Sequence, residues 1–323
     1  MKGECIEKSN YNIITDSMIE TGHLPENFSI LDYVPSEHGA QGELEAVMVR
    51  MPRIIMHPFF VNEVIACVIK RGAEDYSVNG PLSKKVKKAI ETINSYEPVT
   101  IADRVLSLMY KKNDEVARRK KNADFARFLI EEGDTLQSVK FGLAMLGVFG
   151  EADNEDDIKL VKTLGCCDEF TFFSVKTLTR LLSGNAFNEA AVTLMAETRG
   201  WGKIAAVLEL PDKIDDEKLR LAILAKGAKN ELGLYHLAAE CAIKGGLNDY
   251  LLNMESENEK MPEIISNGIC DIFDGLFEAE KLDGDSFNEV PNINLIITDF
   301  CLMYERGLIS GTAADIYERL KNR

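Results

Sequence analysis

Two stretches of this chain match each other at a fixed offset of 62 residues. Residues 154–175 align with residues 216–237, and Gly165 with Asp168 in the first copy corresponds to Gly227 with Asn230 in the second. A repeated unit of helix, glycine, capping residue and helix is typical of stacked α-helical arrays, in which each unit buries its apolar face against its neighbours. The repeat therefore predicts an all-α fold.

Apolar residues at helical spacing continue on both sides of the repeat. Helices of roughly 10 to 17 residues are expected to follow one another across short breaks, because short links between helices make neighbours antiparallel. The expected breaks are Gly150, Gly165, Gly184, Gly200, Pro211, Gly227 and Gly245–Gly246. Glycine just past a helix end adopts the left-handed conformation. The residues expected to start the next helices are Thr135, Asp153, Asp168, Asn185, Asp215 and Asn230.

Three regions are expected along the chain. Residues 1–57 form an irregular N-terminal arm. Its residues 1–45 lack sustained periodicity and are expected to be irregular or partly ordered, and residues 44–56 fit either an extended piece or a short helix. Residues 58–134 form an N-terminal helical region. Residues 135–323 form the helical repeats and end in a capping helix at 308–323. Since no long Pro/Gly/Ser linker interrupts the pattern, we expect one continuous superhelix.

Four helices are expected in the N-terminal helical region. The first begins near Pro58 and ends at Gly72, with its apolar stripe formed by Phe60, Val64, Cys67 and Val68. Ser83 is expected to cap the second, and Thr100 precedes the third. The fourth covers about 114–132, with an apolar face of Val116, Phe125, Phe128 and Leu129.

The helix pairs broken by glycine resemble those of HEAT-like α-solenoid repeat proteins. The segment Gly200–Leu208 is similar to a recurring element of bacterial HEAT-like proteins that have no assigned activity. The resemblance covers about 135–254 well, and 58–134 and 255–323 loosely. It implies a curved helical scaffold and implies no particular chemistry.

Composition points to a soluble chain in a reducing compartment. The apolar fraction of 46% and the charged fraction of 28% are ordinary for globular proteins. No uncharged apolar run approaches the length of a membrane span, and the polar start lacks the apolar core of a signal peptide. The seven cysteines are scattered through apolar runs, as is usual for small buried side chains. We therefore expect a cytoplasmic protein without a membrane partner.

The net charge is −16, yet residues 51–130 hold 15 basic and 9 acidic side chains. The basic cluster consists of Lys84, Lys85, Lys87, Lys88, Lys111, Lys112, Arg118, Arg119, Lys120 and Lys121. Basic clusters bind phosphate backbones, and some HEAT-like proteins are DNA-repair glycosylases that grip DNA in a basic concave channel. This chain is acidic where such a channel would run, and lysine on the outer face of an amphipathic helix explains the cluster. Nucleic acid is therefore not the expected partner.

Motifs for catalysis, cofactors or metals are not found. Cys166–Cys167 lacks the spaced second pair of a zinc site, and the positions correspond to Ala228 and Lys229 in the second copy. The acidic run 153–157 lacks the glycine and distal glutamate of a calcium loop and fits a solvated helix start. The histidines are His23, His38, His57 and His236, and no two form a local metal pair. We expect no catalytic residue, no cofactor and no metal.

Trp201 is the residue most suited to recognition. It lies between two glycines and is flanked by Arg199 and Lys203, and tryptophan and arginine are enriched at binding hot spots. The alternative is that Trp201 fills the gap between consecutive helical units. His57, at a junction between loop and helix, is a further candidate. The predicted binding residues are thus Arg199, Trp201, Lys203 and His57.

The function expected from these features is non-enzymatic. The concave face of the solenoid would bind a protein or peptide of basic or mixed charge. The alternative is an enzyme, either a HEAT-like DNA-base glycosylase or one with an unrecognised pocket. A glycosylase should place Trp201 or another aromatic beside a carboxylate and several Arg or Lys side chains in one groove. A purely structural oligomer is a third possibility.

Overall fold

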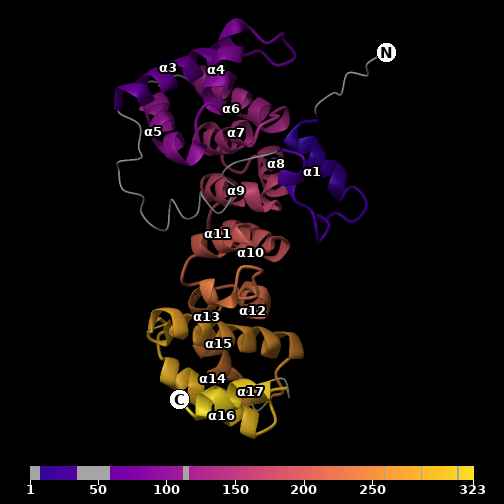
Figure 1. The fold of residues 1–323 in the computed structure, drawn as a ribbon, viewed down its shortest axis with the longest axis vertical. Coiled ribbons are helices and arrows are strands. Elements are labelled where there is room, and N and C mark those ends of the chain that lie inside the picture. The colour runs from indigo at the N-terminus through magenta and orange to yellow at the C-terminus, as the bar shows by residue number, and fades with distance from the viewer. Residues whose placement is uncertain (1–7, 35–58, 112–115, 258, 285, 311–312) are drawn as a thin grey trace. The chain divides into compact units, whose positions relative to one another are not determined.

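The computed structural model describes residues 8–34, 59–111, 116–257, 259–284, 286–310 and 313–323 (Figure 1). These residues form α-helices and short 3-10 helices, and no strand occurs among them. The prediction of an all-α fold is therefore confirmed. The contacts divide the chain into two compact units, residues 1–183 and residues 184–323, which are described separately below. The boundary expected at 134/135 falls inside the first unit.

The first unit contains α1 and a run of helices from α3 to α9. Its elements are α1 (Asn10–Met18), η1 (Ile30–Asp32), α3 (Phe59–Asp75), α4 (Lys84–Asn94), α5 (Pro98–Lys111), α6 (Val116–Glu131), α7 (Leu136–Phe149), α8 (Glu155–Gly165) and α9 (Asp168–Leu181). The first helix, α1, contacts α6 and α8. The Asn10 side chain and backbone both donate to the carbonyl of Gly133 at 3.0 Å. Within residues 1–45, which we expected to be irregular or partly ordered, this helix is ordered.

Local capping explains where several helices begin. The hydroxyls of Ser83 and Thr135 accept the backbone N–H groups of Val86 and Ser138, at the starts of α4 and α7. Both caps were expected from the sequence. The start of α8 differs by one residue, because Asn154 and not Asp153 accepts the N–H of Asp157.

Helix α7 forms the centre of the first unit and contacts α5, α6 and α9. Its apolar residues Val139, Phe141, Leu143 and Leu146 are fully buried. A Cβ atom at Gly142 would lie 3.0 Å from the carbonyl oxygen of Ala126, so this glycine lets α6 approach closely. The high apolar content of α7 thus reflects burial on several sides, not a single amphipathic face.

The apolar face predicted for α3 is wrong. Phe60 and Val64 are 67% and 58% exposed, and the buried side chains are instead Ile65, Ile69 and Ala73. Gly72 does not end the helix; a Cβ there would collide with Ala89 of α4. The two helices pack through small residues, so close backbone approach decides which side of α3 faces inward.

The second unit contains the remaining helices. These are α10 (Gly184–Glu197), α11 (Trp201–Glu209), α12 (Glu217–Lys226), η3 (Leu234–His236), α13 (Ala238–Lys244), α14 (Leu247–Glu257), α15 (Glu263–Asp283), η4 (Ser286–Glu289), α16 (Ile293–Glu305) and α17 (Ala314–Lys321). Helix α15 contacts α12, η3 and α13 (Figure 1). It ends at Gly284, which has a φ of 84°, as the sequence predicted. The terminal helix α17 lies within the expected capping segment.

The two copies of the 62-residue match fold differently. In the first, α9 begins at Asp168, as predicted. In the second, the side chain of Asn230 accepts the N–H of Leu232 in a local turn, and α13 begins only at Ala238. Gly233, with a φ of 127°, follows that turn. The expectation that Asn230 starts a helix is therefore wrong, because its side chain stabilises a turn instead.

The two repeat glycines, Gly165 and Gly227, were expected to adopt the left-handed conformation, and this expectation is wrong. Gly165 lies inside α8, and Gly227 has a φ of −68°, so neither adopts the left-handed conformation. Gly227 is required for space: a Cβ there would lie 2.6 Å from the Sγ of Cys241. Among the expected breaks, positive φ occurs at Gly184 and Gly246.

Asp299→Asn should raise stability at neutral pH and lose that advantage in acid. Asp299 of α16 is 4% exposed, and its Oδ2 has no hydrogen-bond partner. Burial, followed by the charge of Glu255, raises the pKa of Asp299 above its ordinary value of 3.8. The native state therefore binds this proton more tightly than the unfolded state, and stability falls as the pH rises from about 4 through the native pKa. Urea unfolding of both proteins at several pH values measures the difference; a difference independent of pH contradicts the prediction.

Candidate functional site

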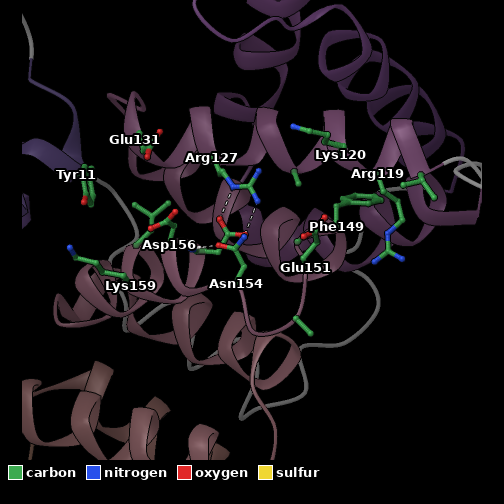
Figure 2. A pocket seen from close by; sticks show the side chains of 16 residues that line it. Tyr11, Arg119, Lys120, Arg127, Glu131, Phe149, Glu151, Asn154, Asp156 and Lys159 are labelled. Atoms are coloured by element: carbon green, nitrogen blue, oxygen red, sulfur yellow. Dashed lines mark hydrogen bonds and ion pairs between the residues drawn. The ribbon is translucent and has the colours of Figure 1, made fainter.

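A groove of about 890 Å³ lies between α6 and the first turns of α8 in the first unit (Figure 2). Tyr11 of α1 and Phe149 at the end of α7 lie at its opposite ends. The lining residues are Tyr11, Val116, Arg119, Lys120, Ala123, Arg127, Glu131, Phe149, Gly150, Glu151, Ala152, Asn154, Asp156, Asp157, Lys159 and Leu160. Residues far apart in the sequence therefore form one continuous surface.

An ion pair between α6 and α8 forms the middle of the groove. Arg127 Nε donates to Asp157 Oδ1 at 2.6 Å, and a terminal guanidinium nitrogen donates to Oδ2 at 2.8 Å. The other terminal nitrogen donates to Asp124 at 2.9 Å. The Asp157 side chain is 1% exposed and that of Arg127 is 28% exposed. The hydrogen bond to Asp157 raises the pKa of Arg127, so this bidentate pair is a fixed part of the site.

Charged side chains of both signs surround this pair. Figure 2 shows Glu131, Asp156 and Lys159 near Tyr11 on one side of Arg127, and Arg119, Lys120 and Glu151 near Phe149 on the other. Lys120 also pairs with Asp124 at 3.0 Å. Burial, followed by the charge of Glu132, raises the pKa of the Glu131 carboxyl.

The Phe149 end of the groove carries apolar and aromatic surface. Val116, which we expected on the buried face of its helix, is 85% exposed and lines the groove. Tyr110 of α5 lies with its ring centroid 6.4 Å from that of Phe149, and the Arg119 guanidinium carbon is 6.0 Å from the Tyr110 centroid. The N-terminal turn of α6 therefore presents its side chains outward, and α6 packs through later residues such as Phe125 and Leu129.

The predicted recognition residues lie in the second unit. Trp201 begins α11, is partly exposed, and has its ring centroid 5.7 Å from that of His236. Lys203 is 7% exposed, and its ammonium donates to the carbonyls of Lys226 and Lys229 at the end of α12. The Arg199 carbonyl accepts the N–H of Glu231 at 3.0 Å. Arg199 and Lys203 therefore connect the start of α11 to the end of α12 and the turn after it, whereas Trp201 contacts η3.

His57 lies outside the described residues, so its placement is not known. It remains a sequence-based candidate. Arg199, Trp201 and Lys203 likewise remain predictions as binding residues, since these contacts within the second unit neither require nor prevent contact with a partner.

The vicinal cysteines occupy the link between α8 and α9. Cys166 follows α8, its Sγ donates to the carbonyl of Lys162 at 3.4 Å, and Cys167 is 3% exposed. Burial raises the pKa of the Cys167 thiol well above its ordinary value. A protonated, buried thiol is a poor nucleophile and a poor metal ligand. Across the described ranges, no three His, Cys, Asp or Glu side chains are grouped so that they could hold a metal ion.

The described residues of the basic cluster lie on exposed faces of α4 and α6 and at Lys111, the last residue of α5; Lys112 lies outside the described residues. Lys84, Lys85, Lys87 and Lys88 are exposed, whereas Val86, Ala89 and Ile93 of the same helix are buried. Lys85 pairs with Asp75 at 3.0 Å, and Lys88 pairs with Glu91 at 3.4 Å. The interpretation that these lysines lie on the outer face of an amphipathic helix fits this arrangement.

Comparisons of this chain with protein families, with curated proteins and with solved structures returned no match. None of the described helices has the length and apolar character needed to cross a lipid bilayer. Functional inference therefore depends on the chain's own residues.

Proposed function

We propose that this chain is a non-catalytic binding module whose groove between α6 and α8 holds a short segment of a protein partner. One observation carries the proposal: a groove of about 890 Å³ surrounds a rigid ion pair with separate charges of both signs on either side. A polypeptide segment offers complementary charges at several positions, and such complementarity provides specificity and fast association.

The fixed middle of the groove favours binding. Because Arg127 is held by Asp157 and Asp124, its side chain is already ordered before a partner arrives. Pre-ordering reduces the entropy lost on association. Tyr11 and Phe149 add aromatic surface at the two ends, and aromatic residues are enriched in protein interfaces. The net charge of −16 favours a partner of basic or mixed charge.

The HEAT-like character of the fold is part of this proposal. Within the first unit, helices two apart in the sequence contact each other, as α5 does with α7 and α7 with α9. Such contacts support a stack of helical layers. In the second unit, α15 contacts α12 in addition to α13 and η3. It therefore packs against a helix three α-helices earlier, so the stacking is less regular there.

Reversing charge in the groove tests the proposal. A displayed library of random peptides is selected against the whole protein, and enriched peptides are measured by fluorescence anisotropy against Arg119→Glu and Lys159→Glu. We expect each variant to weaken binding by roughly tenfold, the value for loss of one charged contact. Lys87→Glu, which makes the same charge change on the exposed face of α4, is the control. Peptides insensitive to both groove variants, or no enrichment, would overturn the proposal.

A second candidate, a DNA-base excision enzyme, is favoured by one specific observation. The groove places Tyr11 and Phe149 beside carboxylates and beside Arg119, Lys120 and Lys159, which is the combination expected for that class. Glu131, Glu151 and Asp156 in the same groove oppose phosphate binding. Anisotropy with a duplex containing an abasic site, at low and physiological salt, separates the candidates. Binding that falls steeply with salt and with Lys159→Glu would favour DNA.

A further inference from the structure

Arg220 of α12 carries a guanidinium group without a partner. Its Nε is shielded from solvent and makes no hydrogen bond, although the residue as a whole is partly exposed, and its side chain forms no ion pair with the residues that the structure describes. The contrast with Arg127 is direct, since three nitrogens of that guanidinium donate to carboxylates. A shielded N–H donor without an acceptor is costly, and in native proteins such an atom usually meets water or a ligand.

Two adjoining cavities share Arg220 as a wall. The first, of about 360 Å³, is lined by Asp212, Lys213, Ile214, Asp215, Arg220, Ile243, Lys244, Gly246 and Asp249. The second, of about 110 Å³, is lined by Glu217, Arg220, Leu221, Gly245, Tyr250, Asn253 and Met254. Both lie within the second unit, between α12 and the link that joins α13 to α14. The larger cavity alone has the volume of a small-molecule site.

The link between α13 and α14 is shaped to admit the arginine. Gly246 has a φ of +66°, and a Cβ there would lie 3.1 Å from a terminal nitrogen of Arg220. A Cβ at Gly245 would lie 2.6 Å from a methyl carbon of Leu224. The two glycines therefore let the chain pass close to α12 and leave space for the guanidinium where the cavities meet.

We propose that Arg220 anchors the carboxylate group of a small ligand at the junction of these cavities. The guanidinium presents parallel N–H groups that match the two oxygens of a carboxylate. Lys213 lines the larger cavity and supplies a second cation. This site is separate from the groove of the proposed function and does not depend on it.

The surroundings select a carboxylate over a phosphate. Asp212, Asp215 and Asp249 line one cavity and Glu217 lines the other. Their repulsion grows with the charge of the ligand, so a singly charged group is favoured over a doubly charged one. Burial raises the pKa of Tyr250 to about 12, which keeps its phenol neutral and able to donate a hydrogen bond in the smaller cavity.

Calorimetric titration of the whole protein tests the site. The probes are acetate, pyruvate, the proteinogenic amino acids and triglycine, with inorganic phosphate and triglycine amide for comparison. We expect at least one carboxylate to bind, and Arg220→Gln to weaken it by roughly 10- to 100-fold. Arg180→Gln, at an exposed arginine of α9, is the control. Preference for free acids identifies a small-molecule site, whereas preference for triglycine over its amide identifies a polypeptide C-terminus.

Two results would overturn the proposal: no carboxylate binds the wild type, or the best one binds Arg220→Gln equally well. Thermal unfolding without ligand provides a second test. If Arg220 exists for a ligand, Arg220→Met should leave the melting temperature unchanged or raise it by up to about 4 °C, because the change removes an unsatisfied Nε donor and breaks no hydrogen bond or ion pair. A clear fall in melting temperature would assign Arg220 a structural role instead.

Discussion

Asp157→Ala is expected to lower the free energy of unfolding by about 3 kcal/mol, the cost of breaking a buried ion pair by removing one partner. The Asp157 side chain is 1% exposed and accepts two hydrogen bonds from Arg127, so its removal leaves the guanidinium beside an empty space. The value lies at the lower end of the known range because Arg127 is 28% exposed and retains Asp124. Chemical denaturation monitored by circular dichroism measures the change.

The neighbouring residue provides the control. Asp156→Ala removes an exposed carboxylate from the same turn of α8 and should change stability by no more than about 0.5 kcal/mol. The double variant Arg127→Met with Asp157→Leu replaces the pair with apolar side chains and should recover most of the loss. Equal effects of Asp157→Ala and Asp156→Ala would show that the pair does not hold α6 to α8.

Where local chemistry decided the structure, the sequence was a good guide. Ser83 and Thr135 cap helices as expected, and Gly284 ends α15 in the left-handed conformation. Each depends only on one residue and the backbone within four residues of it. The prediction that Asn230 starts a helix was wrong for a similarly local reason, because an amide side chain that can cap a helix can equally close a turn.

Where packing between helices determines which side chains are buried, sequence patterns did not predict the buried face. Phe60 and Val64 fit an apolar stripe as well as Ile65 and Ile69 do, and the face that is buried is the one that packs against neighbouring helices, with α4 close to Gly72. Which face of α3 is buried thus depends on packing against other helices, and the spacing of apolar residues within α3 does not reveal that packing.

The groove was missed because its residues come from separate elements, and Arg127 and Asp157 are 30 residues apart. One signal was present. Asp157 lies on the same face of its helix as Leu160, Val161 and Leu164, at helical spacing. A carboxylate on a buried stripe requires a cation, so the stripe predicts a partner for Asp157 without identifying it.

Gly268→Ala is expected to destabilise the second unit by at least about 2 kcal/mol, although helix propensity predicts the opposite sign. Gly268 lies inside α15, where alanine would ordinarily stabilise by about 1 kcal/mol. A Cβ at this position would lie 2.7 Å from the Cα of Ala225 and closer still to the carbonyl oxygen of Leu224. Both atoms belong to the backbone of α12 and cannot rotate away, so the helices must separate, at a cost typical of overpacking or greater.

The sign of the effect makes this test decisive. Glu278→Ala, at an exposed position of the same helix, measures the propensity of α15 without the close approach and should remain within about 0.5 kcal/mol of the wild type. A Cβ at Gly275, seven residues after Gly268, would lie 2.7 Å from the Cβ of Ala238 and from the carbonyl oxygen of Leu234, so Gly275→Ala should behave like Gly268→Ala. If both glycine variants were more stable than the wild type in thermal unfolding, α15 would not pack against α12 and η3 through its glycines.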